Sequence, residues 1–409
     1  MPRAFDRDRD LEHLQRIWRE TGWLKDGEKF ERGLDAYLKA CNTIVEDLHG
    51  EMEVGASRAE GVLRVQQTSV PLCVIAGVYA GIAGRQGGHA TRLTALQVAA
   101  GVADGAVVAS LGIFDQGFYE RLGFGIGPYV HRITVEPSSL KVPRLERSPV
   151  RLTVDDAAEI HACRLARRHS HGCVDLSHAG VTELGCCEHA GAGLGFRDTD
   201  GVLTHCMWVS QDGKAEDGPW SVQWMAWRTP AQLFELLGIV KSFADQVSGV
   251  RIADPAGLQL QDLIDRPFAW LRRTKGGPNY GKPTSIAYWQ HRICDVQACM
   301  AALSLPRADA KFNLRLRDPI EGHLPGDAPW KGCAGDWIVS LGERCGAEAG
   351  RDEALPTLEA SINAFTRMWI GVRSAQSLAI TDDLSGSDAL LDTLSAQWTL
   401  PEPATDWDY

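Results

Sequence analysis

A glycine-rich loop between an apolar strand and a helix is the feature that most limits what this chain can fold into. The apolar run ends at residues 78–80, Val-Tyr-Ala, and the loop 85–90, Arg-Gln-Gly-Gly-His-Ala, follows it. A helix is expected from about residue 90 to 102, and the first N–H groups of a helix have no partners within it. Glycines let such a backbone approach an oxyanion closely. The loop therefore predicts an anion-binding turn, although a plain tight turn between strand and helix has the same pattern.

The loop does not fit two well-known nucleotide motifs. No Gly-Lys-Ser/Thr follows it, which excludes a P-loop, and the dinucleotide pattern Gly-x-Gly-x-x-Gly is absent. About thirty residues further on, GFYERLGF at residues 117–124 places Tyr119 in a short aromatic and glycine-containing turn. This order suits a protein that holds a pyrophosphate on backbone amides and places a phenol near the reactive end of the same cofactor.

Length and charge narrow the class of protein. A chain of 409 residues predicts two to four domains. The formal net charge of −11 disfavours nucleic acid as a partner and favours a cationic ligand. The apolar part of residues 66–84 is too short for a membrane span, which needs about 20 apolar residues. The charged N-terminus shows no secretion signal, and 11 cysteines without framework spacing fit reduced thiols. We therefore expect a cytoplasmic protein without a membrane or nucleic-acid partner.

Alternation of helical and strand-like patterns predicts an α/β (α+β) protein with three domains. The first covers residues 1–145, and the Pro-, Ser- and charge-rich stretch 136–149 ends it as a linker. The second domain, residues 146–292, starts a new mixed pattern. In the third, residues 293–409, alternating apolar residues are followed by three helical stretches.

The loop and the tyrosine turn together resemble the GNAT superfamily of acetyl-CoA-dependent N-acetyltransferases. That superfamily binds the coenzyme A pyrophosphate with R/Q-x-x-G-x-G/A, matched here by Arg85, Gly88 and Ala90, and presents a tyrosine in a later F-Y-x-x-x-G-F turn. The whole chain resembles the Eis (enhanced intracellular survival) family within it. FTRMWIGVRSAQSLA at residues 365–379 resembles the family's sterol-carrier-protein-like last domain, and WDY at residues 407–409 resembles its terminus. Residues 20–65 match the family poorly.

The resemblance implies three domains: a catalytic GNAT domain, a GNAT-like domain without the cofactor loop, and the sterol-carrier-like domain that delivers the C-terminus to the active site. It implies acetyl-CoA as cofactor, a small-molecule amine as acceptor, and a homo-oligomer, a hexamer in this family. Backbone groups of the strand and loop would hold the cofactor, namely Val78, Tyr79, Ala80, Arg85, Gln86, Gly87, Gly88, His89 and Ala90. Two aromatic residues and an acid would line the amine pocket, namely Trp18, Trp23 and Asp408.

The resemblance also implies an N-acetyltransferase acting on a primary amine of a cationic, aminoglycoside-like molecule or of a lysine side chain. Tyr119 is the candidate general acid, because a phenol with an ordinary pKa near 10 suits a thiolate leaving group. The carboxylate of Tyr409 is the candidate base for the incoming ammonium. A lipid or acyl carrier and a non-catalytic acyl-CoA sensor are the alternatives. Residues 369 and 378, Trp and Leu, would line the carrier's apolar tunnel.

A run rich in His and Cys, residues 161–189, suggests two hypotheses that we discount, a metal site and a Cys–His nucleophile. Its spacing contains no C-x-x-C pair, so we expect no metal site. Cys173 and His171 have the residue types of a nucleophile and its base. Residues two apart do not face each other on a helix, however, and no oxyanion hole is marked.

Overall fold

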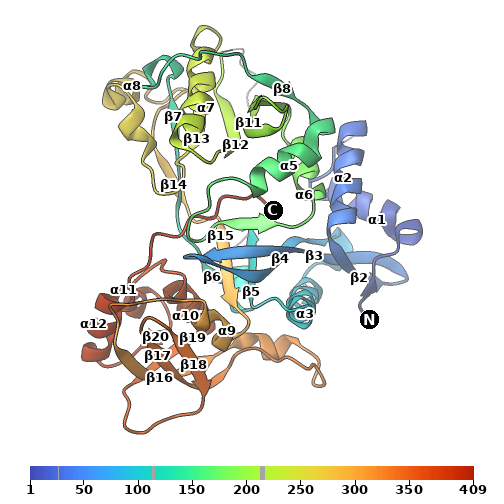
Figure 1. Cartoon of the computed structure of the whole chain (residues 1–409). Helices are drawn as coiled ribbons and strands as arrows, with labels where there is room; N and C mark the ends of the chain where they lie inside the picture. Colours follow the sequence, from blue (N-terminus) through green and yellow to red (C-terminus); the bar gives the residue numbers. More distant parts are fainter. Residues whose placement is uncertain (26, 113–115, 212–216) are drawn as a thin grey trace.

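The computed structural model describes residues 1–25, 27–112, 116–211 and 217–409. Among these residues the strands form three sheets, of eight, seven and five strands. Figure 1 shows the first sheet in the middle of the molecule, the second above it, and the third at the lower left. The C-terminus lies between the first and second sheets, whereas the helices that precede it in the chain lie beside the third sheet.

The first sheet has the order β1-β2-β3-β4-β5-β15-β6, and β9 pairs with β3. Its strands are β1 (Arg3–Ala4), β2 (Asn42–Leu48), β3 (Glu51–Val65), β4 (Thr68–Ala80), β5 (Val108–Gly112), β6 (Gly125–Ile126), β9 (Val174–Leu176) and β15 (Trp289–Ile293). Helices α1 (Arg7–Glu20) and α2 (Glu28–Ala40) cover one face, and α3 (His89–Ala103) covers the other. Asp6 starts α1 by accepting the N–H of Asp8, so a side chain satisfies one of the helix's unpaired donors.

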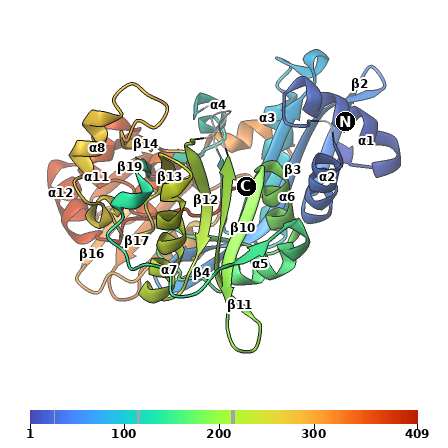
Figure 2. The same ribbon diagram turned by 90° about the horizontal axis from the view of Figure 1, so that it is seen from above.

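The second sheet has the order β14-β7-β13-β12-β11-β10-β8. Its strands are β7 (Val130–Val135), β8 (Val150–Leu152), β10 (Gly191–Arg197), β11 (Leu203–Gln211), β12 (Trp220–Ala226), β13 (Val250–Ala253) and β14 (Thr284–Ile286). The helices around it are α5 (Ala157–Leu165), α6 (Gly180–Glu188), α7 (Pro230–Ser242) and α8 (Pro267–Arg273). Seen from above, β12 and β10 lie beside the chain end (Figure 2).

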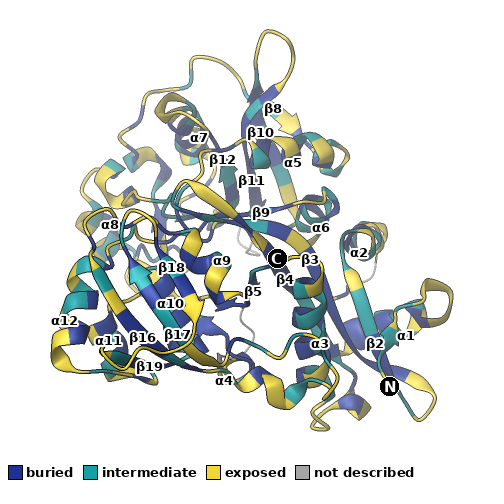
Figure 3. Ribbon diagram, turned by 60° about the horizontal axis from the view of Figure 1, so that its bottom comes forward, coloured by how far each residue is buried: buried dark blue, intermediate teal, exposed yellow. Residues whose placement is uncertain are grey.

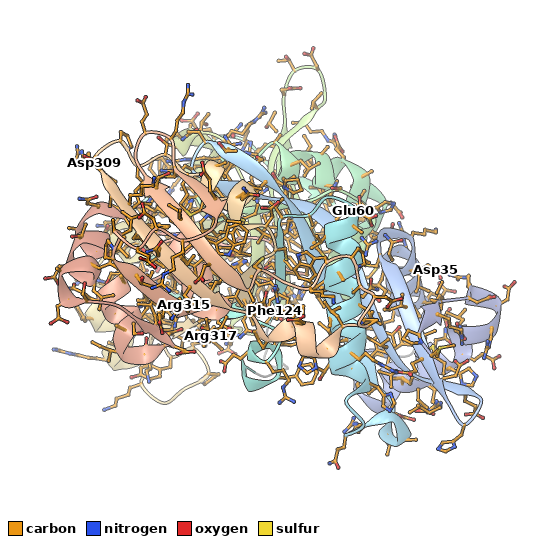
Figure 4. All side chains as sticks on the ribbon, turned by 90° about the horizontal axis from the view of Figure 1, so that it is seen from below. Asp35, Glu60, Phe124, Asp309, Arg315 and Arg317 are labelled. Carbon is orange, nitrogen blue, oxygen red and sulfur yellow. The ribbon has the colours of Figure 1, made fainter. Side chains whose placement is uncertain are left out.

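The third sheet has the order β18-β17-β16-β19-β20. Its strands are β16 (Ala310–Arg317), β17 (Gly335–Leu341), β18 (Gly346–Ala349), β19 (Thr357–Ser361) and β20 (Leu384–Ser385). Its helices are α9 (Val296–Ala301), α10 (Ile362–Trp369), α11 (Ala375–Thr381) and α12 (Asp388–Gln397). Each sheet and the helices packed on it are called a unit below. The third unit lies on one side of Figure 4, where Asp309, Arg315 and Arg317 are labelled, and Asp35 of α2 lies on the other side.

The sheets do not follow the expected boundaries at residues 145 and 292. β7 precedes residue 145 but pairs with β13 of the second sheet, while β15 and β9 follow residue 145 but complete the first sheet. β15 lies between β5 and β6, so the chain returns to the first sheet after finishing the second. A linker-like composition near residue 140 therefore does not mark a change of sheet.

Two candidate tunnel residues of the carrier alternative are core residues. Trp369 and Leu378 are both fully buried in the largest apolar cluster, which joins the third unit to β3 and β4. The indole N–H of Trp369 donates to the carbonyl of Cys299 at 2.8 Å. Figure 3 shows such buried residues, in dark blue, along the central strands beside the chain end.

A fully buried ion pair connects the first sheet to the third unit. Arg292 of β15 donates to Asp318 at 2.6 Å, and neither side chain is exposed. Asp318 also accepts the N–H of Cys333 at 2.8 Å, and Arg292 donates to the carbonyl of Leu122, in the turn that follows Tyr119. Removing one charge of such a pair leaves the other buried without a partner.

We predict that Asp318→Asn lowers the free energy of unfolding by about 3–5 kcal/mol, because Arg292 keeps its charge in a water-free site. The matched control is Asp383→Asn, since Asp383 pairs with Arg317 at 2.7 Å on the surface. We expect the control to change stability by less than about 1 kcal/mol. Urea unfolding followed by tryptophan fluorescence measures both, and equal midpoints for the two variants would contradict the prediction.

Candidate active site

The first helix amides after β4 are free to bind an anion. Gly88 is the N-cap of α3 in the left-handed region, with φ +73°, and no side chain caps the helix. Among the described residues, none accepts a hydrogen bond from the backbone N–H groups of residues 86–91. These donors and the positive end of the helix dipole point to one place, which suits a phosphate or pyrophosphate.

The loop is surrounded by one exposed cationic side chain and by two basic side chains that bind a buried carboxylate. Arg85 is exposed and forms no ion pair with any described residue. Arg92 and His89 both bind the buried Glu46 of β2, with His89 at 3.0 Å. Burial raises the pKa of Glu46, but the bonds from Arg92 and His89 outweigh burial and lower it. The His89 ring lies so close to Gly87 that a Cβ there would be 2.4 Å from it. Arg85 is therefore the side chain available to a bound anion.

β4 and β5 separate just before the loop. They pair in parallel from Leu72–Val108 to Ile75–Leu111, whereas β4 continues to Ala80 along β3. The register with β3 shifts after Ile75, so Ala76 is an extra residue in β4. Such a bulge bends its strand and increases its twist, which opens the gap toward β5.

Residues 78–80 lie along this gap. Val78 and Ala80 pack on the α3 face, and Tyr79 packs between α1 and α2 on the other face. Their edge toward β5 pairs with no strand among the described residues. Main-chain donors at the gap are therefore available to an extended, amide-bearing ligand.

Tyr119 lies in α4 (Gln116–Glu120), on the α3 face of the sheet. It packs with Leu111 of β5, and its ring contacts those of Phe118 and Phe124 at 4.8 and 6.2 Å. Burial, helped by the nearby phenol of Tyr288, raises the pKa of Tyr119 to about 12. The phenol therefore keeps its proton at any physiological pH and can only donate it.

Tyr409 lies on the opposite face of the same strand. Its hydroxyl group hydrogen-bonds the hydroxyl of Ser110, and its ring contacts that of Trp289 at 4.6 Å between centroids. Ser110 and Leu111 are neighbours in β5, so their side chains point to opposite faces. Tyr119 and the chain end thus flank β5 from its two faces, beside the gap to β4.

Residues 405–407, close to the end of the chain, are held by contacts with other elements. Trp407 is 1% exposed and lies under the guanidinium group of Arg164, at 3.9 Å from the ring centroid. Asp406 receives two hydrogen bonds from Arg167, at 2.8 and 2.7 Å. Thr405 contacts a ring nitrogen of His291 at 3.2 Å. The two terminal aromatic residues are thus packed in the molecule, so the tail has a defined position.

Two residues that the sequence did not single out lie near Asp408. Glu188 ends α6, where the helix dipole disfavours a negative charge, and it has no hydrogen bond or ion pair among the described residues. Glu188 is exposed to solvent, and the protein around it together with the charge of Asp408 raises its pKa. Tyr288 packs against Gly112 at the end of β5 and makes a ring contact with Trp289 at 4.7 Å. No spacing in the sequence relates these residues to Tyr409.

Trp18 and Trp23 lie together but differ in exposure. Trp18 is 6% exposed and packs against Tyr37 and Tyr79, with ring centroids 5.0 and 6.0 Å away. Trp23 is 42% exposed and contacts Trp18 and Tyr79 from the outside. Trp18 is therefore a core residue of the α1–α2 face, and Trp23 is the one that a ligand can reach.

The His- and Cys-rich run has structural roles in the described residues. His171 accepts the N–H of Gln66 at 3.0 Å and contacts the carbonyl of Ile370 at 2.9 Å, so both its ring nitrogens are used. Burial raises the pKa of Cys173 to about 12, which keeps it a thiol. No group of three or more His, Cys, Asp or Glu side chains in the described part of the chain is placed to hold a metal ion. No described helix is long and apolar enough to cross a bilayer.

Solved structures of similar fold cover the entire chain. A conserved protein of Enterococcus faecalis V583, described as a probable N-acyltransferase, has a TM-score of 0.78 at 15% identity and covers 100% of this chain and 99% of its own. A GCN5-related N-acetyltransferase of Anabaena variabilis has a TM-score of 0.77 at 14% identity and covers 100% of both chains. Eis1 of Mycobacterium abscessus has a TM-score of 0.75 at 16% identity and also covers 100% of both.

These likenesses establish the fold. No family model and no curated protein matches the chain by sequence. The architecture is nevertheless that of GNAT N-acetyltransferases in the Eis-like arrangement, over the full length. The α/β class and the Eis-like resemblance that the loop, the tyrosine turn and the terminus predicted are thereby confirmed at the level of the fold.

We predict that Trp407→Ala releases the last residues, because the side chain fills a buried site under Arg164. Removing a buried tryptophan side chain costs about 3–5 kcal/mol. Carboxypeptidase digestion followed by mass spectrometry should then remove the tail at least tenfold faster than in the wild type. The control Glu402→Ala changes an exposed residue of the same tail and should leave the rate unchanged. Equal digestion rates for both variants would show that Trp407 does not anchor the tail.

Proposed function

We propose that this protein is an acetyl-CoA-dependent N-acetyltransferase that acts on a primary amine of a cationic molecule. The observation that carries the proposal is the gap between β4 and β5. Free helix amides lie at one end of it, Tyr119 on one face of the adjoining strand, and the chain end on the other face. This arrangement provides one position for a thioester and a separate approach for an amine.

The residues at the gap fit coenzyme A as a ligand. The free N–H groups of residues 86–91 and the exposed Arg85 would hold its pyrophosphate, and the unpaired edge of residues 78–80 would hold its amide-bearing arm. When bound, acetyl-CoA supplies an activated acetyl group as a thioester. Val78 and Ala80, which face α3, line the same side of the sheet as Tyr119.

The chain's own groups would manage the two protons of the transfer. The C-terminal carboxylate of Tyr409 would accept a proton from the incoming ammonium, so that a neutral amine attacks the thioester carbon. The C–N bond would form and the C–S bond would break, Tyr119 would donate its proton to the departing thiolate, and the second proton that the nitrogen loses would return to the phenol. Holding the amine and the thioester in one geometry supplies much of the remaining acceleration.

Acidic groups favour a cationic acceptor. Neither Asp408 nor Glu188 forms a direct ion pair with a described residue, and the charge of Asp408 acts on Glu188 and on Tyr288, which lines the same cleft as Asp408. Two carboxylates close to each other favour a ligand that brings positive charge. An aminoglycoside-like amine and a lysine side chain both meet this requirement. The homo-oligomer and the cytoplasmic location implied by the resemblance, and the sterol-carrier-like nature of the third unit, stay predictions.

We predict that Tyr119→Phe lowers kcat for thiol release from acetyl-CoA about a hundredfold or more, since a general acid contributes at least that much. In the wild type, kcat should rise with pH as the amine loses its proton. No decline below pH 10 should follow, because the pKa of Tyr119 is about 12. Amines, lysine peptides and aminoglycosides serve as acceptors in this assay.

The matched control for this experiment is Tyr280→Phe, which removes a phenol from the second unit. Its rate should equal that of the wild type at every pH. Acetyl-CoA binding measured by calorimetry separates the proposal from a sensor. Tight binding without thiol release to any acceptor would identify a non-catalytic binding protein instead.

We further predict that deleting Tyr409, or extending the chain beyond it, abolishes turnover and leaves acetyl-CoA affinity unchanged. The deletion removes the ring that contacts Ser110 and Trp289 and moves the carboxylate by one residue. The control is Tyr409→Phe, which keeps the carboxylate and the ring and should retain most activity. Full turnover by a C-terminally tagged protein would refute the role of the chain end.

A further inference from the structure

The second sheet repeats the separation of two parallel strands. β12 and β13 pair only at Trp220–Val250 and Ser221–Arg251, although β12 continues to Ala226. Beyond these pairs, no described main-chain group bonds the edge of residues 222–226 that faces β13. A cavity of about 560 Å³ lies at this separation, a size typical of ligand sites.

Coenzyme A does not fit this second gap, because the helix that follows β12 caps itself. Thr229 accepts the N–H of Gln232 at 3.3 Å, and the Gln232 side chain accepts the N–H of Thr229 at 3.3 Å in return. Pro230 occupies the first turn of α7 and has no N–H to offer. A helix N-terminus whose first N–H groups are largely capped or replaced by proline is poorly suited to a pyrophosphate, so a different kind of ligand must be considered.

The walls of this cavity combine aromatic rings with both signs of charge. Tyr129 is 51% exposed, whereas Trp224 and Trp227, which also line the cavity, are 8% and 9% exposed. Arg132 forms no ion pair with any described residue, and Asp254 has a pKa raised by burial. The main-chain edge of β12 adds hydrogen-bonding groups in the spacing of a strand. An extended peptide can pair its main chain with a strand edge, and its side chains can contact aromatic rings and charges of either sign.

The cavity is continuous with the candidate active site. Asp408, Tyr288 and Trp289 line it, and Trp289 contacts the ring of Tyr409. Tail residues 402–406 form another part of the wall. A chain lying in the cavity would therefore end beside the last residue of the protein, where the acceptor amine is required.

We propose that the gap between β12 and β13 binds an extended peptide whose lysine side chain is the acceptor amine. This inference rests on the proposed function and specifies its substrate. The peptide would lie along the edge of β12 as an added strand, with its side chains against Tyr129 and Trp227. Its lysine would extend past Asp408 toward Tyr409.

The test uses capped peptides of one, three, five and seven residues, each with a single central lysine among alanines. For the wild type, kcat/KM for thiol release should rise at least tenfold between one and five residues, because the longer chains occupy the cavity. Tyr129→Ala should lower kcat/KM about tenfold for the seven-residue peptide and leave that for capped lysine unchanged.

Phe268→Ala is the matched control, since Phe268 is 64% exposed on α8 and does not line the cavity. Phe268→Ala should change kcat/KM neither for the seven-residue peptide nor for capped lysine. Ala253→Trp, which narrows the cavity from β13, should reproduce the loss for the long peptide, and unfolding midpoints show that each variant is folded. Equal kcat/KM for all four lengths in the wild type would overturn the proposal. A dependence on Tyr129 for aminoglycosides but not for peptides would do so as well.

A binding measurement separates this inference from the proposed function. Fluorescence polarisation of a labelled seven-residue peptide, with its lysine already acetylated, needs no turnover. Binding that Tyr129→Ala weakens and Phe268→Ala does not would support the peptide site even if no acceptor released thiol. Thiol release from capped lysine without any binding of the long peptide would support the enzyme and refute the site.

Discussion

The parting of β4 from β5 is the constraint on which the rest of the site depends. Strands that stay paired use their main-chain groups on each other, and nothing remains for a ligand. One extra residue, Ala76, shifts the register of β4 against β3, and the last five residues of β4, 76–80, continue without β5. The edge of β4 is left open where α3 begins, so the free main-chain donors of β4 lie next to the free N–H groups of α3. A bulge of this kind is a small change in one strand with a large effect on what the sheet can bind.

The chain end reaches the gap only because buried contacts hold the tail across the second unit. Trp407 contacts Arg164 in the last turn of α5, Asp406 binds Arg167 just after this helix, and neither contact depends on the last residue itself. Ser110 then fixes the Tyr409 ring on the first sheet. The tail thus contacts two sheets, and its anchors lie on both sides of the proposed amine approach. A free terminus, which is ordinarily mobile, becomes a positioned group.

Local patterns in the sequence predict the position of the loop, of the turn that holds Tyr119 and of most helices and strands, because these depend on neighbours in the chain. Gly88 adopts the positive φ that a loop glycine permits, and the strand before it and the helix after it lie where the periodicity placed them. Trp18 shows the limit of such reasoning, since its type fits both a pocket and a core, and only the structure shows it buried. Glu188 and Tyr288 were missed because they come to the site through pairings between distant segments.

The return of β15 to the first sheet has a consequence for how the protein is made. β5 pairs with β4 on one side and β15 on the other, so the central sheet stays incomplete until residues 289–293 leave the ribosome. During that interval the nascent chain exposes an unpaired strand edge, which is a template for association with other chains. All strands of the second sheet precede residue 289, so they leave the ribosome while the first sheet is unfinished. Fragments cut near residue 145 would keep this open edge permanently and be prone to aggregate.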